Sequence, residues 1–149
     1  MLEEIYNYRR LSDRVGTAGQ PTAAQFKDVR DAGFEVVINL ALPTSDNALA
    51  DEGSIVTGLG MAYVHLPVNF KTPSARDFEA FCGLMKTFEG RRIFVHCAAN
   101  MRVSAFMLLY RIRHEQTPHH VAGPDLHAVW EPDEVWSRFI HEQLAKPKE

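Results

Sequence analysis

The segment RRIFVHCAANMRVSAFMLLYRI, residues 91–112, constrains the fold more than any other part of the chain. It begins with an apolar run of strand character, passes through the pair His96 and Cys97, and continues into a helical pattern from Ser104. A strand that leads through a short loop into a helix is the repeating unit of parallel α/β sheets. The intervening loop is therefore expected at the carboxyl edge of a sheet.

The rest of the chain repeats this alternation of strand and helix patterns. Thr22 and Gln25 have the spacing of a capping box, and Gly33 is expected to end the helix that they begin. Strands are predicted at 14–19, 34–41, 61–68 and 91–97, and helices at 20–34, 48–59, 72–90 and 104–115. This order predicts one α/β domain over residues 1–149, with a mostly parallel central sheet, right-handed crossovers and flanking helices.

The pattern changes after residue 115. Residues 116–127 are predicted to be a turn-rich stretch, and residues 131–146 an amphipathic helix packed across one side of the sheet. Residues 69–73 and 119–126 are expected to form the walls of a binding site. The apolar face of the last helix is predicted to hold Val135, Trp136, Phe139, Ile140 and Leu144.

Length, composition and charge exclude several classes of protein. With 149 residues, 46% of them hydrophobic and 23% charged, the chain has the size and composition of one globular domain. A net charge of -3 gives no overall field for nucleic acid or an anionic membrane. The first residues are acidic where a signal peptide is basic, and no stretch approaches the roughly 18 apolar residues of a membrane span. We expect a cytoplasmic protein in which Cys82 and Cys97 are free thiols.

Cys97 stands where the predicted fold favours an anion. Open α/β sheets bind ligands at the carboxyl ends of their strands. Loop amides and the positive end of the following helix suit a phosphate group there. The same field favours a thiolate, which is the nucleophilic form of cysteine. Residues 96–104 are therefore predicted to be a phosphate-binding loop with a cysteine nucleophile.

This loop resembles the signature H-C-x5-R-S/T of the cysteine-based dual-specificity and protein-tyrosine phosphatases. His96, Cys97 and Ser104 stand at the matching positions. Residues 15–41, VGTAGQPTAAQFKDVRDAGFEVVINLA, are similar to the opening of small dual-specificity phosphatases. They are more similar to a bacterial phosphatase-like family associated with β-lactamase hydrolase-like proteins. The resemblance, which covers residues 10–115, implies a dual-specificity-phosphatase-like fold.

The resemblance also implies a mechanism and a set of roles. A phosphomonoester, possibly carried by a phosphoprotein, would be hydrolysed through a phosphocysteine on Cys97, without a metal or other cofactor. Ser104 would donate a hydrogen bond to the thiolate, and His96 would orient the loop. The loop amides that would hold the phosphate oxygens belong to Ala98, Ala99, Asn100, Met101, Arg102 and Val103.

Three positions depart from the signature. Val103 occupies the arginine position, and Arg102 comes one residue early, so that Arg102 would reach the anion only in a shorter C-x4-R loop. Asn100 replaces a glycine, but asparagine tolerates a left-handed backbone. Asn69 replaces the aspartate that serves as general acid in dual-specificity enzymes, and an amide cannot donate that proton.

Other interpretations of the chain stay open. Val103 and Asn69 favour a weak or inactive pseudophosphatase that binds phosphate or a phosphoprotein, and a rhodanese-like sulfurtransferase is a further alternative. Asp77 could act as an acid, although its helix-capping position favours a structural role. Residues 130–133, WEPD, are expected to start the last helix, with a lid or acid over the pocket as the alternative.

Two further groups of residues are interpreted as structural. Cys82 lies on the apolar stripe of a predicted helix and is expected in the core. His119, His120 and His127 have no cysteine or carboxylate at ligand spacing, so no metal site is predicted.

Overall fold

The structure, a computed structural model, describes residues 1–147 and contains a five-stranded sheet of order β1-β2-β5-β3-β4. The short β1 is antiparallel to β2, and all other neighbouring strands are parallel. The strands are Arg9–Arg10 (β1), Val15–Ala18 (β2), Val36–Asn39 (β3), Ala62–His65 (β4) and Ile93–His96 (β5). The predicted α/β fold with a mostly parallel sheet is thereby confirmed.

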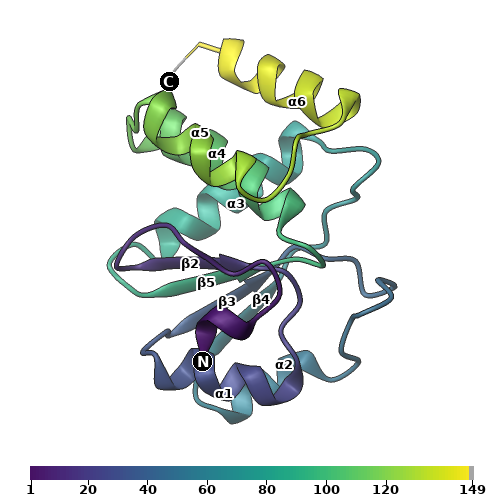
Figure 1. The fold of residues 1–149 in the computed structure, drawn as a ribbon, viewed down its shortest axis with the longest axis vertical. Helices are drawn as coiled ribbons and strands as arrows, with labels where there is room; N and C mark the ends of the chain where they lie inside the picture. Colours follow the sequence, from purple (N-terminus) through teal and green to yellow (C-terminus); the bar gives the residue numbers. More distant parts are fainter. Residues whose placement is uncertain (148–149) are drawn as a thin grey trace.

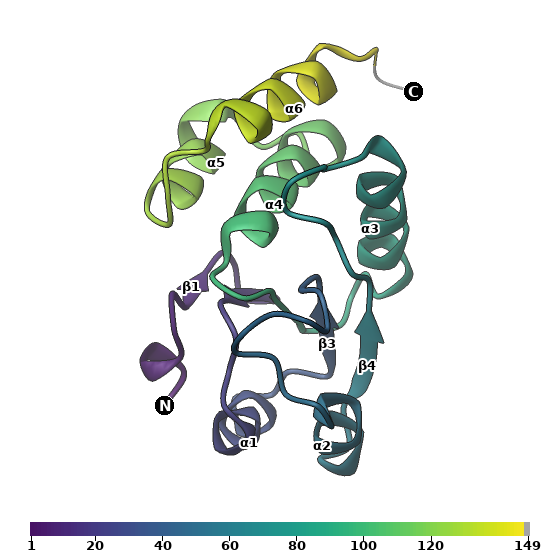
Figure 2. The ribbon, with the colours of Figure 1, turned by 90° about the vertical axis from the view of Figure 1, so that its right-hand side faces the viewer.

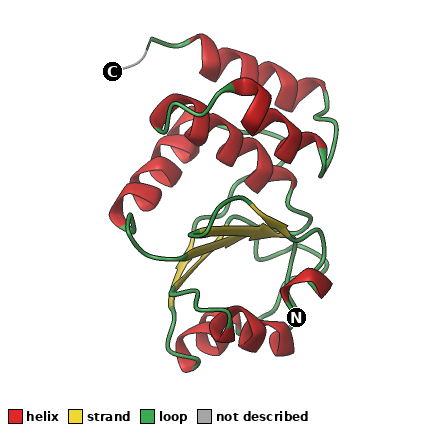
Figure 3. Cartoon of the chain, turned by 60° about the vertical axis from the view of Figure 1, so that its left-hand side comes forward, coloured by secondary structure: helices red, strands yellow, loops and turns green. Residues whose placement is uncertain are grey.

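Helices cover both faces of the sheet (Figure 1). They are η1 (Leu2–Glu4), α1 (Ala23–Asp31), α2 (Glu52–Gly58), α3 (Ala75–Thr87), α4 (Met101–His114), α5 (His119–His127) and α6 (Glu134–Ala145). α1 and α2 lie on one face, whereas α3 and α4 lie on the other, with α5 and α6 beyond α4 (Figures 1 and 2). Figure 3 shows the strands between these two helical layers.

The core consists of two apolar clusters, one on each face of the sheet. Strands β2, β3 and β5 are buried along their whole length because helices cover both of their faces. The larger cluster joins the sheet to α3, α4 and α6 through the rings of Phe81, Phe106 and Trp136. Cys82 belongs to this cluster, and burial raises the pKa of its thiol to about 12, as expected for an inert core cysteine.

Local signals in the sequence correctly placed several helix ends. Thr22 Oγ1 accepts a hydrogen bond from the Gln25 amide at 3.2 Å, and Gln25 Oε1 accepts one from the Thr22 amide at 2.9 Å. Gly33 follows α1 with a φ of 96°, a left-handed value that favours glycine. Ser74 caps α3 by accepting from the Asp77 amide. The predicted structural position of Asp77 at a helix start is confirmed.

The stretch predicted to be turn-rich is mostly the helix α5. Ala122 and Leu126 of α5 are buried against Leu108 and Ile112 of α4. Asp125 also bonds Arg9 at 2.8 Å and Arg111 at 2.7 Å. Packing and ion pairing therefore outweigh the weak helix propensity of the Gly-Pro pair inside this segment.

The last helix packs differently from the prediction. α6 lies against α4, so that α4 separates it from the sheet (Figure 2). Trp136 and Phe139 face Phe106 of α4, with ring centroids 5.9 and 6.1 Å away. Val135 is 44% exposed, contrary to the prediction, because in the first turn of α6 it lies at the margin of the face that Trp136 and Phe139 bury.

The described part of the chain carries neither a metal cluster nor a membrane span. Within residues 1–147, no three His, Cys, Asp or Glu side chains are grouped to hold a metal ion. Among the same residues, no helix combines the length and the apolar character needed to cross a bilayer.

Candidate active site around Cys97

Cys97 follows β5 at the centre of the carboxyl edge of the sheet. In register, His96 is the neighbour of Ala18 on β2 and of Asn39 on β3. The chain leaves β5 towards α4 on one face, whereas β2 and β3 lead to helices on the other face (Figure 2). Open α/β sheets bind their ligands at such switch points.

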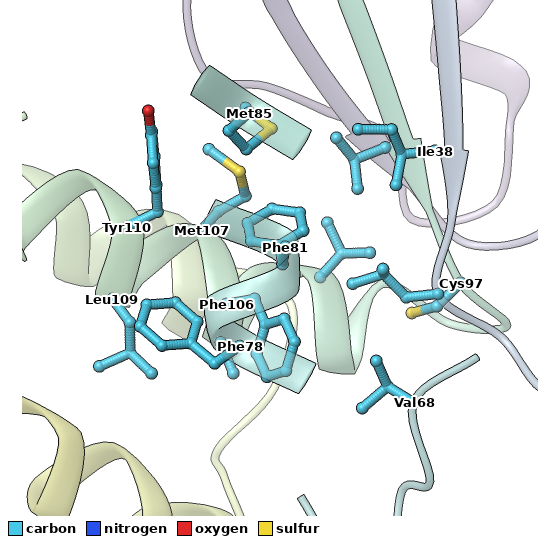
Figure 4. Packing of buried hydrophobic residues seen from close by; sticks show 14 of the residues in the cluster. Ile38, Val68, Phe78, Phe81, Met85, Cys97, Phe106, Met107, Leu109 and Tyr110 are labelled. Atoms are coloured by element: carbon cyan, nitrogen blue, oxygen red, sulfur yellow. The ribbon is translucent and has the colours of Figure 1, made fainter. Parts of the chain in front are cut away.

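The Cys97 side chain is fully buried, at one end of the larger cluster and near Val68 (Figure 4). A surface cleft of about 260 Å³ lies elsewhere, against Arg14, Val15 and Arg111, and is lined by none of the loop residues. The candidate site therefore rests on the geometry of the loop itself.

The loop turns its carbonyl oxygens outward. Three successive carbonyls, those of Cys97, Ala98 and Ala99, each have a hydrogen-bond partner, either at the first residue of the loop or outside it. Because the C=O and N–H of a trans peptide point in opposite directions, the amides of the next residues point inward. The partners are His96 Nδ1 for Cys97 O (3.1 Å), Gln20 N and Asn47 Nδ2 for Ala98 O (3.1 and 3.2 Å), and Asn7 Nδ2 for Ala99 O (3.0 Å).

Several loop amides have no backbone partner. Within residues 1–147, no backbone carbonyl accepts a hydrogen bond from the amides of Ala98, Ala99, Met101, Arg102 or Val103. The last three form the first turn of α4, where helix geometry leaves N–H groups free. A loop of inward amides joined to a helix N-terminus is suited to bind an anion such as phosphate.

Asn100 gives the loop its turn. Its φ of 66° and ψ of 5° are left-handed, as predicted for this position. Its Nδ2 donates to the Asn7 carbonyl at 2.9 Å and to Thr17 Oγ1 at 3.1 Å. Asn7 returns a hydrogen bond to the Ala99 carbonyl. No signal in the sequence pointed to Asn7, which lies 93 positions before Asn100.

Gly19 allows the loop to approach β2 closely. A Cβ atom at this position would lie 2.8 Å from the Ala98 carbonyl oxygen and 3.1 Å from the Ala99 Cα. Both atoms are backbone and cannot swing aside. Only glycine therefore fits between β2 and the loop as they are arranged here.

Arg102 is buried beside the loop with part of its guanidinium unpaired. Its Nη1 donates to the Val68 carbonyl at 3.0 Å, and its guanidinium carbon lies 5.9 Å from the centre of the Phe70 ring. Among the described residues, its Nε is buried without a hydrogen-bond partner. Buried donors in proteins nearly always have acceptors, so this N–H is a group that a bound anion can satisfy. The arginine at the loop is Arg102, in the C-x4-R spacing.

Val103 and Ser104 do not have the side-chain positions that the longer signature implies. The Val103 side chain is fully buried in the larger cluster. Ser104 Oγ donates to the Met101 carbonyl at 2.9 Å and accepts from Trp130 Nε1 at 3.1 Å. Since a hydroxyl has one proton, the predicted bond from Ser104 to the thiolate is not made in this structure. The reason is that α4 begins at Met101, three residues earlier than predicted, which turns Ser104 towards Trp130.

Behind the loop, His96 pairs with a buried carboxylate that the sequence did not reveal. His96 Nε2 lies 2.7 Å from Glu52 Oε2, and Gln20 Nε2 donates to Glu52 Oε1 at 2.6 Å. Burial by itself would raise the pKa of Glu52. The hydrogen bond and charge of His96, with bonds from Gln20 and Tyr63, hold that pKa below its ordinary value. A glutamate in the first turn of a helix gives no sign in the sequence that it is buried.

The loop after β4 lies against Arg102 and is fixed by aromatic side chains. Asn69 Oδ1 accepts from the Lys71 amide at 2.9 Å, so this side chain shapes the loop. The Phe70 ring lies 5.6 Å from that of Trp130 and 5.8 Å from that of Trp136. Trp136 Nε1 also donates to the Phe70 carbonyl at 2.7 Å.

The segment 130–133 has two roles in the structure. Asp133 caps α6 by accepting from the Trp136 amide at 2.8 Å, which confirms the predicted helix start. Through Trp130, the same segment contacts both Ser104 and the loop after β4.

A mostly parallel α/β sheet with a His-Cys loop at its carboxyl edge is the architecture of dual-specificity-type phosphatases, as the resemblance of the loop implied. The chain belongs to the family described as DSP-PTPase phosphatase fused to NAD+ kinase, whose model matches residues 6–134.

One curated relative matches about two thirds of this chain. The beta-lactamase hydrolase-like protein of Agrobacterium fabrum (strain C58) is 32% identical over 104 residues. These residues are 67% of this chain but 24% of that protein, so the chain spans about a quarter of the length of this relative. The match confirms the family resemblance inferred from residues 15–41 and from the cysteine loop.

Solved structures share the fold over nearly the whole chain. A candidate phosphatase (DUF442) of Shewanella putrefaciens CN-32 has a TM-score of 0.86 and 34% identity, covering 97% of this chain and 95% of that one. P. aeruginosa TpbA, in complex with phosphotyrosine, has a TM-score of 0.72 and 15% identity, covering 90% and 82%. PTPMT1, in complex with PI(5)P, has a TM-score of 0.71 and 18% identity, covering 93% and 97%. At the two lower identities, the likeness concerns the fold.

Proposed function

We propose that this protein hydrolyses phosphomonoesters through a phosphocysteine intermediate on Cys97. The observation that carries the proposal is the buried Nε of Arg102, which has no partner among the described residues and lies beside a loop with free inward amides. The cation and the amide donors thus belong to the same short segment of chain as the cysteine. Membership of a phosphatase family supports the same chemistry.

The proposed reaction has two steps and uses no metal or other cofactor. In the first, the Cys97 thiolate attacks phosphorus, a bond forms between sulfur and phosphorus, and the bond to the leaving oxygen breaks. In the second, water attacks the phosphocysteine and releases inorganic phosphate and the thiolate. The amides of residues 98–103 and the Arg102 guanidinium would hold the three terminal oxygens throughout, and electrostatic stabilisation of this kind is usually the largest catalytic contribution.

The leaving oxygen needs a proton, and Asn69 cannot supply it. General acid catalysis typically contributes about 10²- to 10⁴-fold. We therefore expect turnover to be fastest with leaving groups that depart without protonation. Structures of this fold hold esters as different as phosphotyrosine and PI(5)P, so the proposal is limited to the class of phosphomonoesters, a phosphoprotein among them. Two free thiols support the cytoplasm as the proposed compartment.

A second candidate function is a phosphate- or phosphoprotein-binding module with little turnover. Asn69 favours it, because the Asn69 side chain accepts a hydrogen bond within its own loop and brings no acid to the site. In this case the amides and Arg102 would bind an anion without transferring its phosphoryl group.

The test is hydrolysis of para-nitrophenyl phosphate between about pH 5 and 8, with Cys97→Ser purified in parallel. This substrate has a good leaving group, so a missing acid does not hide the first step. The expected result is activity that is lost in Cys97→Ser, and a phosphoryl adduct on Cys97 in quenched mass spectra. Equal hydrolysis rates in the wild type and in Cys97→Ser would overturn the proposed enzymatic function. Phosphate binding without turnover in calorimetry would then support the binding module.

A further inference from the structure

A carboxylate and an imidazole are buried together directly behind Cys97. Glu52 is the first residue of α2 and His96 the last of β5, and their side chains are 3% and 0% exposed. Glu52 Oε2 and His96 Nε2 lie 2.7 Å apart. Ionisable side chains are almost never so buried unless they are paired. Neither step of the proposed phosphoryl transfer uses Glu52, so the purpose of this pair requires its own explanation.

Both ring nitrogens of His96 face hydrogen-bond acceptors. Nδ1 lies 3.1 Å from the Cys97 carbonyl oxygen, and Nε2 faces the Glu52 carboxyl group. A neutral imidazole has one N–H, whereas an imidazolium donates from both nitrogens. Glu52 Oε1 accepts from Gln20 and Oε2 faces His96, so both carboxyl oxygens are placed as acceptors, and an imidazolium paired with a carboxylate fits this geometry.

Few other titratable groups lie around the ring. From β4, Tyr63 adjoins Glu52, and burial above all raises its pKa to about 12, so Tyr63 is neutral. From α1, the Phe26 ring meets the imidazole edge-on at 5.9 Å. Cys97 itself is the next residue in the chain. Burial disfavours a charged imidazole, and Glu52 is the counter-charge that offsets this cost.

We propose that Glu52 is a positioning residue for Cys97. By keeping His96 doubly protonated, Glu52 fixes the carbonyl with which the phosphate-binding loop begins and maintains a positive charge next to the thiolate. The role of Glu52 in catalysis rests on the proposed phosphatase function. Its effect on the thiol, however, can be measured without any substrate.

The test compares the alkylation of Cys97 by iodoacetamide across pH in the wild type and in Glu52→Gln, followed on the Cys97 peptide by mass spectrometry. Glutamine keeps the size of the side chain and an oxygen for Gln20 but cannot carry the charge. The midpoint of the curve of rate against pH is expected to rise by about one unit, so that at pH values well below the midpoint the rate falls about tenfold. Hydrolysis of para-nitrophenyl phosphate should fall in parallel in kcat/KM.

His96→Asn is the matched variant, because an asparagine can donate to the Cys97 carbonyl but cannot be charged. It should shift the alkylation curve in the same direction. Adding Glu52→Gln to it should produce no further shift, since Glu52 acts only through His96. Burial raises the pKa of the Cys82 thiol to about 12, so Cys82 is the internal reference for unfolding and should stay unmodified in every folded variant.

A folded Glu52→Gln protein with the wild-type alkylation curve would overturn the proposal and leave the pair a structural one. If Glu52→Gln does not fold, an unshifted curve for His96→Asn overturns it equally. A shifted curve in a protein whose wild type hydrolyses no phosphate ester would uphold the role of Glu52 and count against the phosphatase instead.

Discussion

Arg102 stands one residue before the position of the arginine in the longer phosphatase signature, and its guanidinium is buried against Val68 and Phe70 of the loop after β4. The helix α4 begins at Met101, so the loop between strand and helix is short and the first helical turn brings Arg102 to the site. The neighbouring Val103 consequently points into the core. At the scale of single residues, the proposed role of Arg102 therefore depends on the length of the loop.

Arg102→Lys tests this assignment. A lysine keeps the charge but cannot offer the paired N–H groups of a guanidinium. We expect kcat/KM for para-nitrophenyl phosphate to fall by about 10²- to 10³-fold, as on loss of a donor that stabilises the transition state. Arg138→Lys is the control, because Arg138 is exposed and its ion pair within residues 1–147 is with Glu134 of the same helix. Wild-type activity in Arg102→Lys would remove Arg102 from the mechanism.

Val103→Arg tests whether the arginine of the loop belongs at the C-x4-R or at the C-x5-R position. Because the Val103 side chain is fully buried, an arginine there would place an unpaired charge in the core. The free energy of unfolding should fall by about 3 kcal/mol or more, measured by urea denaturation. Val103→Ile, which stays apolar, should cost less than about 1.5 kcal/mol. A stable Val103→Arg with faster hydrolysis would instead favour the longer spacing.

At the scale of elements, the sequence was informative where structure is local. The strands β2 to β5, the capping box at Thr22 and the left-handed Asn100 depend on neighbouring residues and were predicted correctly, whereas the two-residue β1 was missed. α5 was missed because contacts with α4 stabilise it in spite of Gly123 and Pro124. The hydrogen bonds between Asn7 and the loop, and the pairing of Glu52 with His96, were missed because the partners lie far apart in the sequence. A single sequence carries no signal for such contacts.

Gly19→Ala tests the close approach of β2 and the loop. The added methyl would meet the Ala98 carbonyl oxygen, so the loop must shift, and we expect lower stability together with weaker phosphate binding in calorimetry. Gly83→Ala is the matched control, because a Cβ there meets nothing within 4 Å inside α3. That control should be more stable by about 0.5 to 1 kcal/mol. Unchanged phosphate binding in Gly19→Ala would show that the loop tolerates the displacement.

At the scale of the whole molecule, the Glu52–His96 pair links α2 on one face of the sheet to the loop that leads to α4 on the other. Since the pKa of Glu52 is lowered in the folded state, the pair contributes stability above the unfolded pKa of glutamate, about 4.3. This contribution is lost as the pH falls through the lower folded pKa.

Urea unfolding of the wild type and of Glu52→Gln across pH measures that contribution. The wild type should be the more stable protein near pH 6, and the difference should shrink as the pH falls below about 4. A difference between the two proteins that stays constant down to pH 3 or so would mean that the ionisation of Glu52 does not contribute to stability.

The reciprocal bonds of Asn7 with Ala99 and Asn100 join positions 92 and 93 residues apart. In addition, β5 inserts between β2 and β3 rather than adding to an edge. Contacts of such separation form late in folding, because a long stretch of chain must first be closed into a loop. A ribosome releases the N-terminus first, so the segment around Asn7 cannot form these hydrogen bonds until most of the domain has emerged. The loop amides proposed to bind the anion thus take their places around Cys97 only when the sheet closes.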